Sequence, residues 1–167
     1  MKTPEPKKTV ELILYARLHA RLIAVVQRRG NLCMKTDELT PREFPWGLQA
    51  SCRAEYGGTE SALDALWRAL DETFGDYDFM PKRDDELKVL LRLPDRIVYG
   101  CLIDSSTLSD LRIGPFHGSL HILGKSAAKE IEPIALAQRP SYDARVRDGM
   151  LRCHHEALLK GFSVFSS

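Results

Sequence analysis

Residues 60–75 read ESALDALWRALDETFG, and this stretch decides how the rest of the chain is interpreted. Apolar side chains recur in it at intervals of three and four residues, at Leu63, Leu66, Trp67, Leu70 and Phe74. That spacing is typical of an amphipathic helix that packs one face on a core. Thr59 offers an N-cap and Gly75 a C-terminal stop, so the pattern predicts a helix over residues 59–74.

Strand-like segments lie on both sides of this helix. Apolar and β-branched runs predict strands before it at residues 10–18, 22–29 and 46–55, and after it at residues 87–93, 97–104 and 119–123. A second helix is predicted over residues 142–160, close to the end of the chain. This order predicts an α+β fold, in which a mixed β-sheet is sandwiched between helices as an α/β/α structure.

The spacing around the first helix resembles the box of the Nudix family, written G-x5-E-x7-R-E-U-x-E-E-x-G-U with U a bulky aliphatic residue. Glu60 falls on the first glutamate of that pattern and Arg68 on its arginine. Glu72 falls on the first of the paired glutamates, and Gly75 falls on the closing glycine. The segment Trp46-Gly47-Leu48 resembles the Trp-x-Leu that leads into the box in this family.

The resemblance implies a Nudix-like fold and a chemistry. It implies a hydrolase of nucleoside-diphosphate-linked phosphoanhydrides, that is, a pyrophosphohydrolase or phosphoesterase that uses Mg²⁺ or Mn²⁺. Glu72 would be the metal ligand and catalytic residue, whereas Glu60, Arg68 and Gly75 would be structural residues of the box. The candidate substrate-binding residues are Arg28, Arg53 and Tyr56, for which surface charge and core packing are the alternative interpretations.

Two of the three helix glutamates of the box are missing, because Ala69 and Thr73 occupy their positions. At about 100° per residue these two positions and Glu72 share one side of the helix, which is expected to face a solvated cleft. One carboxylate is few for a Mg²⁺ site, and Glu72 also fits a ladder of solvent-facing ion pairs with Arg68. A second hypothesis is therefore a non-catalytic Nudix-fold module that binds a nucleotide or a protein partner, and a third is a scaffold within an oligomer.

Length and composition limit the domain organisation, the cellular compartment and the classes of partner. The 167 residues predict one domain over residues 10–167 behind a disordered leader over residues 1–9. A net charge of +1 gives no overall basic field, which argues against nucleic acid. No apolar run reaches the roughly 20 residues of a membrane-spanning helix. Four cysteines without a C-x-x-C pair indicate reduced thiols and a cytoplasmic protein, and a homodimer remains an open expectation.

Histidines form a further candidate cluster, at His117, His121, His154 and His155. Neighbouring residues of a helix point about 100° apart, so Cys153, His154 and His155 are poorly arranged to bind one ion. A partly exposed helix face is the expectation for the last two histidines, and the role of the set stays open.

Overall fold

The computed structural model describes residues 8–28, 48–74, 86–108, 111, 119–131, 133–134 and 150–166. The predictions that concern Trp46, Gly75 and His117 lie outside these residues. Within the described part, no helix has the length and apolar character needed to cross a membrane.

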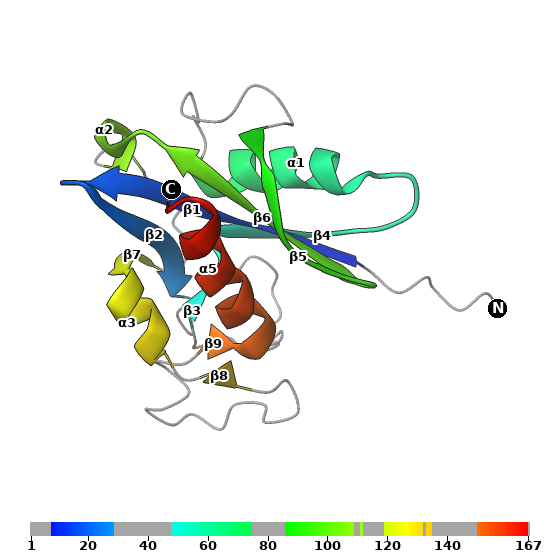
Figure 1. Ribbon diagram of the computed structural model, residues 1–167. Helices are drawn as coiled ribbons and strands as arrows, with labels where there is room; N and C mark the ends of the chain where they lie inside the picture. Colours follow the sequence, from blue (N-terminus) through cyan, green and yellow to red (C-terminus); the bar gives the residue numbers. More distant parts are fainter. Residues whose placement is uncertain are drawn as a thin grey trace.

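A mixed sheet forms the centre of the described part (Figure 1). Its strands are β1 (Lys8–Leu18), β2 (Arg21–Arg28), β3 (Leu48–Gln49), β4 (Cys52–Tyr56), β5 (Lys88–Leu93), β6 (Arg96–Ile103), β7 (Ser119–Gly124), β8 (Pro133–Ile134) and β9 (Met150–Leu151). Their order is β5-β6-β1-β2-β3-β9-β8, with β4 paired to β1 and β7 to β2. Because β1 runs antiparallel to β2 and β4 but parallel to β6, the predicted mixed sheet is confirmed.

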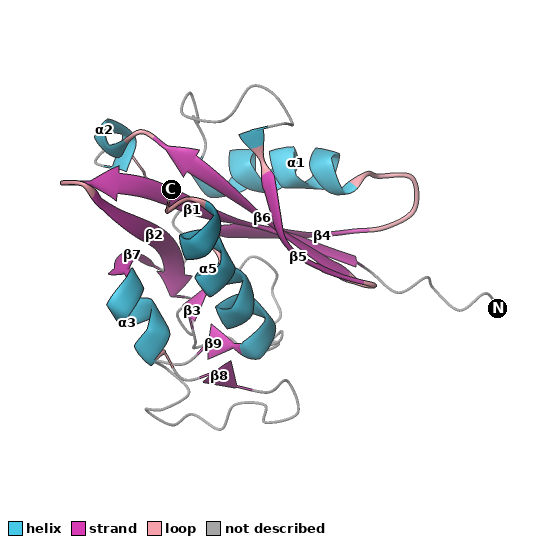
Figure 2. Ribbon diagram, in the orientation of Figure 1, coloured by secondary structure: helices cyan, strands magenta, loops and turns pink. Residues whose placement is uncertain are grey.

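Helices cover both faces of this sheet (Figure 2). The described helices are α1 (Ala62–Phe74), α2 (Ser105–Leu108), α3 (Lys125–Glu130) and α5 (Arg152–Val164). Side chains of a strand alternate between its faces, and those of β1 divide accordingly. Leu12 and Leu14 pack in one core with α1, whereas Ile13 and Tyr15 pack in a second core with α5. The α/β/α arrangement expected from the sequence is therefore present.

The first helix begins later than predicted. Helix α1 starts at Ala62, and the backbone N–H of Asp64 donates to the Ser61 hydroxyl oxygen at 3.1 Å. Ser61 rather than Thr59 therefore caps the helix, because its side chain satisfies a free N–H of the first turn. Glu60 consequently stands before the helix and not within it.

The C-terminal helix is also displaced relative to its prediction over residues 142–160. Helix α5 runs from Arg152 to Val164, and Met150–Leu151 form β9 immediately before it. These two residues are buried and pair with β8 and β3, so they belong to the sheet. Residues 135–149, where the prediction began, lie outside the described part.

The strand predicted over residues 46–55 is two strands separated at Ser51. The Ser51 hydroxyl oxygen accepts the backbone N–H of Leu14 at 2.9 Å, and its O–H donates to the carbonyl oxygen of Val25 at 2.5 Å. Leu14 and Val25 are cross-strand partners in β1 and β2. Ser51 thus takes the place of backbone hydrogen bonds where β1 changes its partner from β4 to β2.

Strand β1 starts at Lys8, two residues before the predicted start of the domain. The N–H of Thr9 donates to the carbonyl oxygen of Asp95 at 2.8 Å, which fixes this end of the strand beside β6. At its other end, His19 and Ala20 have φ values of 51° and 66°. Two left-handed residues are what a tight hairpin turn requires, so β1 and β2 form a hairpin without an Asn-Gly pair.

Candidate functional site

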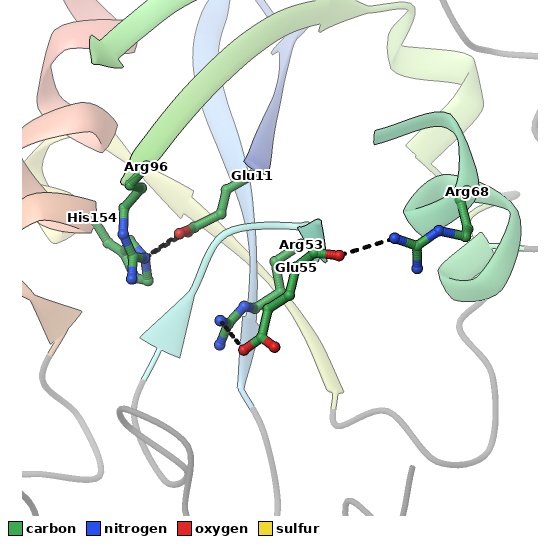
Figure 3. A network of polar contacts seen from close by, with 6 residues as sticks. All are labelled: Glu11, Arg53, Glu55, Arg68, Arg96 and His154. Carbon is green, nitrogen blue, oxygen red and sulfur yellow. Dashed lines mark hydrogen bonds and ion pairs between the residues drawn. The ribbon is translucent and has the colours of Figure 1, made fainter. Parts of the chain in front are cut away.

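Arg68 connects α1 to the segment that precedes it (Figure 3). Its Nε donates to Oε2 of Glu60 at 3.2 Å, and its Nη2 donates to Oε1 of Glu60 at 3.0 Å. The same Nη2 donates to the backbone oxygen of Glu55 in β4 at 2.9 Å. The hydrogen bond to Glu60 raises the pKa of Arg68 above its ordinary value. One guanidinium thus joins β4, the residue before α1 and the helix itself, as a structural residue of the box would.

Glu72 lies on the solvent side of α1. Its Oε1 is 3.8 Å from Nη1 of Arg68, which gives an i, i+4 ion pair. Arg68 is 42% exposed and Glu72 is 36% exposed, so water screens this pair. The solvent-facing ion pair of Arg68 with Glu72 that the sequence predicts is present, and Arg68 also pairs with Glu60 before the helix.

The two positions without a glutamate do not share this exposed side. Ala69 is 1% exposed and Thr73 is 3% exposed. Ala69 belongs to the core that α1 forms with β1 and β4, as do Leu66 and Leu70. The expectation that Ala69, Thr73 and Glu72 face one solvated cleft was wrong. The buried face of the helix is broader than its stripe of large apolar residues, because small side chains at its margin lie against the sheet.

The candidate substrate-binding residues divide between the two faces of the sheet. Tyr56 packs against the core on the α1 side. Arg53 alternates with Cys52 and Ala54 and faces the α5 side, where its Nη2 lies 3.7 Å from Oε1 of Glu55. Arg28 also faces the α5 side by the alternation of β2. The structure therefore does not bring Tyr56 to the same face as the two arginines, and their binding role stays a prediction.

The described histidines point to different places. Nε2 of His155 donates to the backbone oxygen of Ala128 in α3 at 2.9 Å. His121 lies on β7, where burial and the charge of Arg28 lower its pKa. His154 is only 1% exposed, which corrects the expectation of a partly exposed pair. The signal for its burial was its spacing from Leu158 and Phe162 on the apolar face of α5.

A buried charged cluster was missed by sequence reasoning. Glu11 is fully buried in β1, its Oε1 accepts a hydrogen bond from Nη1 of Arg96, and its Oε2 lies 2.5 Å from Nε2 of His154 (Figure 3). The signal was a single acidic residue inside the apolar run VELILYARL. Lone charges are almost never buried unless they are paired.

Comparison with solved structures relates this arrangement to known folds. A MutT/Nudix family protein from Listeria innocua has a TM-score of 0.60 and 16% identity, with 99% of this chain and 96% of that one covered. A MutT/Nudix family protein from Enterococcus faecalis has a TM-score of 0.55 and 16% identity over 98% of this chain, which spans only 63% of that protein. The Nudix domain of Shewanella oneidensis NrtR, solved with ADP ribose, has a TM-score of 0.51 and 11% identity, with 95% and 87% covered.

The chain has the Nudix fold. No family model and no curated protein matches it by sequence. The likeness in structure therefore extends to the fold, and the chemistry has to be argued from this chain's own residues.

The described residues do not fit the divalent metal of a Nudix hydrolase. Mg²⁺ prefers carboxylates that converge on one octahedral site. Among the three box glutamate positions on α1, only Glu72 offers one, since Ala69 and Thr73 are buried and carry none. In the described part, no three His, Cys, Asp or Glu residues gather in a group that could hold a metal ion.

Proposed function

We propose that this chain is a binding module with the Nudix fold, which holds a nucleoside diphosphate derivative without hydrolysing it. The observation that carries the proposal is the burial of Ala69 and Thr73 at the positions of two box glutamates. A glutamate at either position would need its charge in the core, where an unpaired carboxylate is very costly. The helix therefore serves as a packing element.

The retained contacts support the same function. Arg68 still holds Glu60 and the backbone of β4, so the segment that opens the box keeps its anchor. Arg28 and Arg53 supply positive charge on the α5 side of the sheet, and guanidinium groups bind phosphates through paired hydrogen bonds. The same fold holds ADP ribose in the NrtR domain, which makes this compound a sensible first probe.

The experiment is isothermal titration of the full chain with ADP ribose in the presence of Mg²⁺, followed by chromatography of the recovered nucleotide. We expect saturable binding and intact ADP ribose. Arg28→Gln should weaken binding about 10-fold or more, because a charge-assisted hydrogen bond contributes roughly 1.5–3 kcal/mol. Arg92→Gln, which removes an exposed arginine of β5, is the matched control and should bind as the unaltered chain does.

Three results would contradict the proposal. Absence of binding by ADP ribose and by simpler nucleoside diphosphates would remove the ligand and leave a protein partner as the alternative. If Arg28→Gln and Arg92→Gln weakened the binding of ADP ribose equally, the effect would reflect the net charge of the protein and not a contact of Arg28. Recovery of cleaved nucleotide would restore the hydrolase hypothesis, in which Glu72 would hold Mg²⁺ or Mn²⁺.

A further inference from the structure

A group of three buried polar side chains lies between the sheet and the first turn of α5, on the face opposite α1. Glu11 comes from β1, Arg96 from β6 and His154 from α5. The side chains of these residues are 0%, 9% and 1% exposed. Figure 3 shows the Glu11 carboxylate pointing at the other two. Helix α5 contributes only His154 to this group. The helix therefore contacts the Glu11–Arg96 pair of the sheet through the imidazole ring of His154.

We propose that Glu11, Arg96 and His154 form an acid-sensitive latch that holds the first turns of α5 on the sheet. The name latch refers to these three residues. Arg96 donates to one carboxylate oxygen of Glu11, and Nε2 of His154 approaches the other at 2.5 Å. One oxygen of the Glu11 carboxylate therefore contacts Arg96 of the sheet, and the other contacts His154 of the helix. Protonation of the carboxylate at low pH removes its charge and weakens both contacts.

The charges around Glu11 determine the direction of the effect. Burial by itself raises the pKa of Glu11, but His154 from α5, Arg96 from β6 and Arg53 from β4 outweigh it and hold the pKa at about 2. When α5 lifts away and water reaches the carboxylate, its pKa returns toward the ordinary value of 4.5. The released form then binds a proton more readily than the docked form. Docking is thus favoured above pH 4.5 and weakens as the pH falls toward 2.

The contacts of His154 and its neighbour define what the latch holds. Nδ1 of His154 is buried without a hydrogen-bond partner in the described part. Nε2 lies 2.5 Å from Oε2 of Glu11 and 2.6 Å from Nη1 of Arg96, so the ring contacts the sheet through Nε2. His155 donates from its own Nε2 to Ala128 of α3. Because the two histidines are adjacent, movement of this turn breaks the contact with β1 and the contact with α3 together.

The second half of α5 is attached in another way. The Tyr15 hydroxyl donates to the backbone oxygen of Leu158 at 2.8 Å. The rings of Tyr15 and Phe162 meet edge to face with centroids 5.5 Å apart, and Arg17 donates to the backbone oxygen of Phe165 at 2.8 Å. No carboxylate takes part in these contacts. Mild acid should therefore release the first turns of α5 before the remainder of the helix.

The experiment is hydrogen exchange of the full chain between pH 7 and pH 3.5, with each amide rate divided by its intrinsic rate at that pH. Peptides over residues 152–158 should lose protection by pH 3.5, by at most roughly 10-fold, because Arg96 and Arg53 stay beside Glu11 when α5 lifts. Residues 159–164 and β1 should keep theirs. His154→Gln leaves the Glu11–Arg96 pair in place and should lower protection of residues 152–158 already at pH 7. Glu156→Gln, an exposed change on the same helix, should not.

Any of three results would overturn the latch. Residues 152–158 could stay protected to pH 3.5, or could lose protection only together with the whole chain. Alternatively, His154→Gln could exchange as Glu156→Gln does at pH 7. Glu11→Gln provides an additional test when it folds, because it should remove the pH dependence. The pH series and His154→Gln decide the matter without it.

Discussion

Arg68 lies 3.0 Å from Glu60, with Nη2 of the guanidinium facing Oε1 of the carboxylate. Glu60 precedes α1 while Arg68 lies two turns into it, so the pair fixes how the chain enters the helix. The backbone oxygen of Glu55 completes the arrangement at 2.9 Å from the same nitrogen. These contacts join Arg68 to the residue before α1 and to β4, so the chain's own side chains and backbone hold this segment in place.

Arg68→Gln should lower the free energy of unfolding by about 1 kcal/mol, since charge-assisted hydrogen bonds are lost at a site that water partly screens. Urea denaturation measures the change. Glu72→Gln is the control, because its 3.8 Å exposed pair with Arg68 should contribute less than about 0.5 kcal/mol. Equal effects of the two substitutions would show that Arg68 does not brace the segment.

Ala69→Glu should destabilise the fold by roughly 3 kcal/mol or more, because it places a carboxylate in the core. Asp71→Ala changes an exposed position of the same helix and should cost no more than about 0.5 kcal/mol. Thermal melting with and without Mn²⁺ compares them. A ligand that binds only the native state stabilises it, so recovery of Ala69→Glu/Thr73→Glu by Mn²⁺ would reveal a metal site on this face.

The sequence predicts the fold better than it predicts the site. Spacing alone predicted the body and the C-terminal end of α1 and the ion pair of Arg68 with Glu72, because periodicity and local charge pairing are properties of one segment. The burial of Ala69 depends on how closely the sheet approaches the helix, and this distance cannot be predicted from the sequence of α1 alone. The contact of Glu11 with Arg96 and His154 joins residues far apart in the chain, so no local pattern could place it.

Stability should fall with acid through Glu11. Burial raises its pKa, but the nearby charges hold it at about 2 against 4.5 when exposed. This pKa difference contributes on the order of 3 kcal/mol to the free energy of unfolding above pH 4.5, and the contribution is lost as the pH falls toward 2. Urea unfolding across this range measures it. Glu11→Gln/Arg96→Met removes both charges of the Glu11–Arg96 pair, and this part of the pH dependence should vanish. An unchanged profile would assign the effect to other carboxylates.

Gly161→Ala should weaken the attachment of α5, because a Cβ at this position would overlap the hydroxyl and ring of Tyr15. Tyr15 would have to move and give up its hydrogen bond to Leu158. We expect a loss of about 1–3 kcal/mol in the free energy of unfolding, as for other overpacked cores. Gly57→Ala is the matched control, since nothing lies within 4 Å of a Cβ there. Similar stability of both variants would contradict the close approach of α5 to β1.

We propose that this Nudix-fold chain binds its ligand without hydrolysis, because Glu72 is the only carboxylate at the three box glutamate positions of α1 and a Mg²⁺ site needs several oxygen ligands. The most direct measurement is phosphoanhydride hydrolysis by the purified chain, with ADP ribose and other nucleoside diphosphate derivatives in Mg²⁺ or Mn²⁺. We expect no turnover above that of Glu72→Gln. Robust turnover that Glu72→Gln abolishes would contradict it and make Glu72 the catalytic metal ligand.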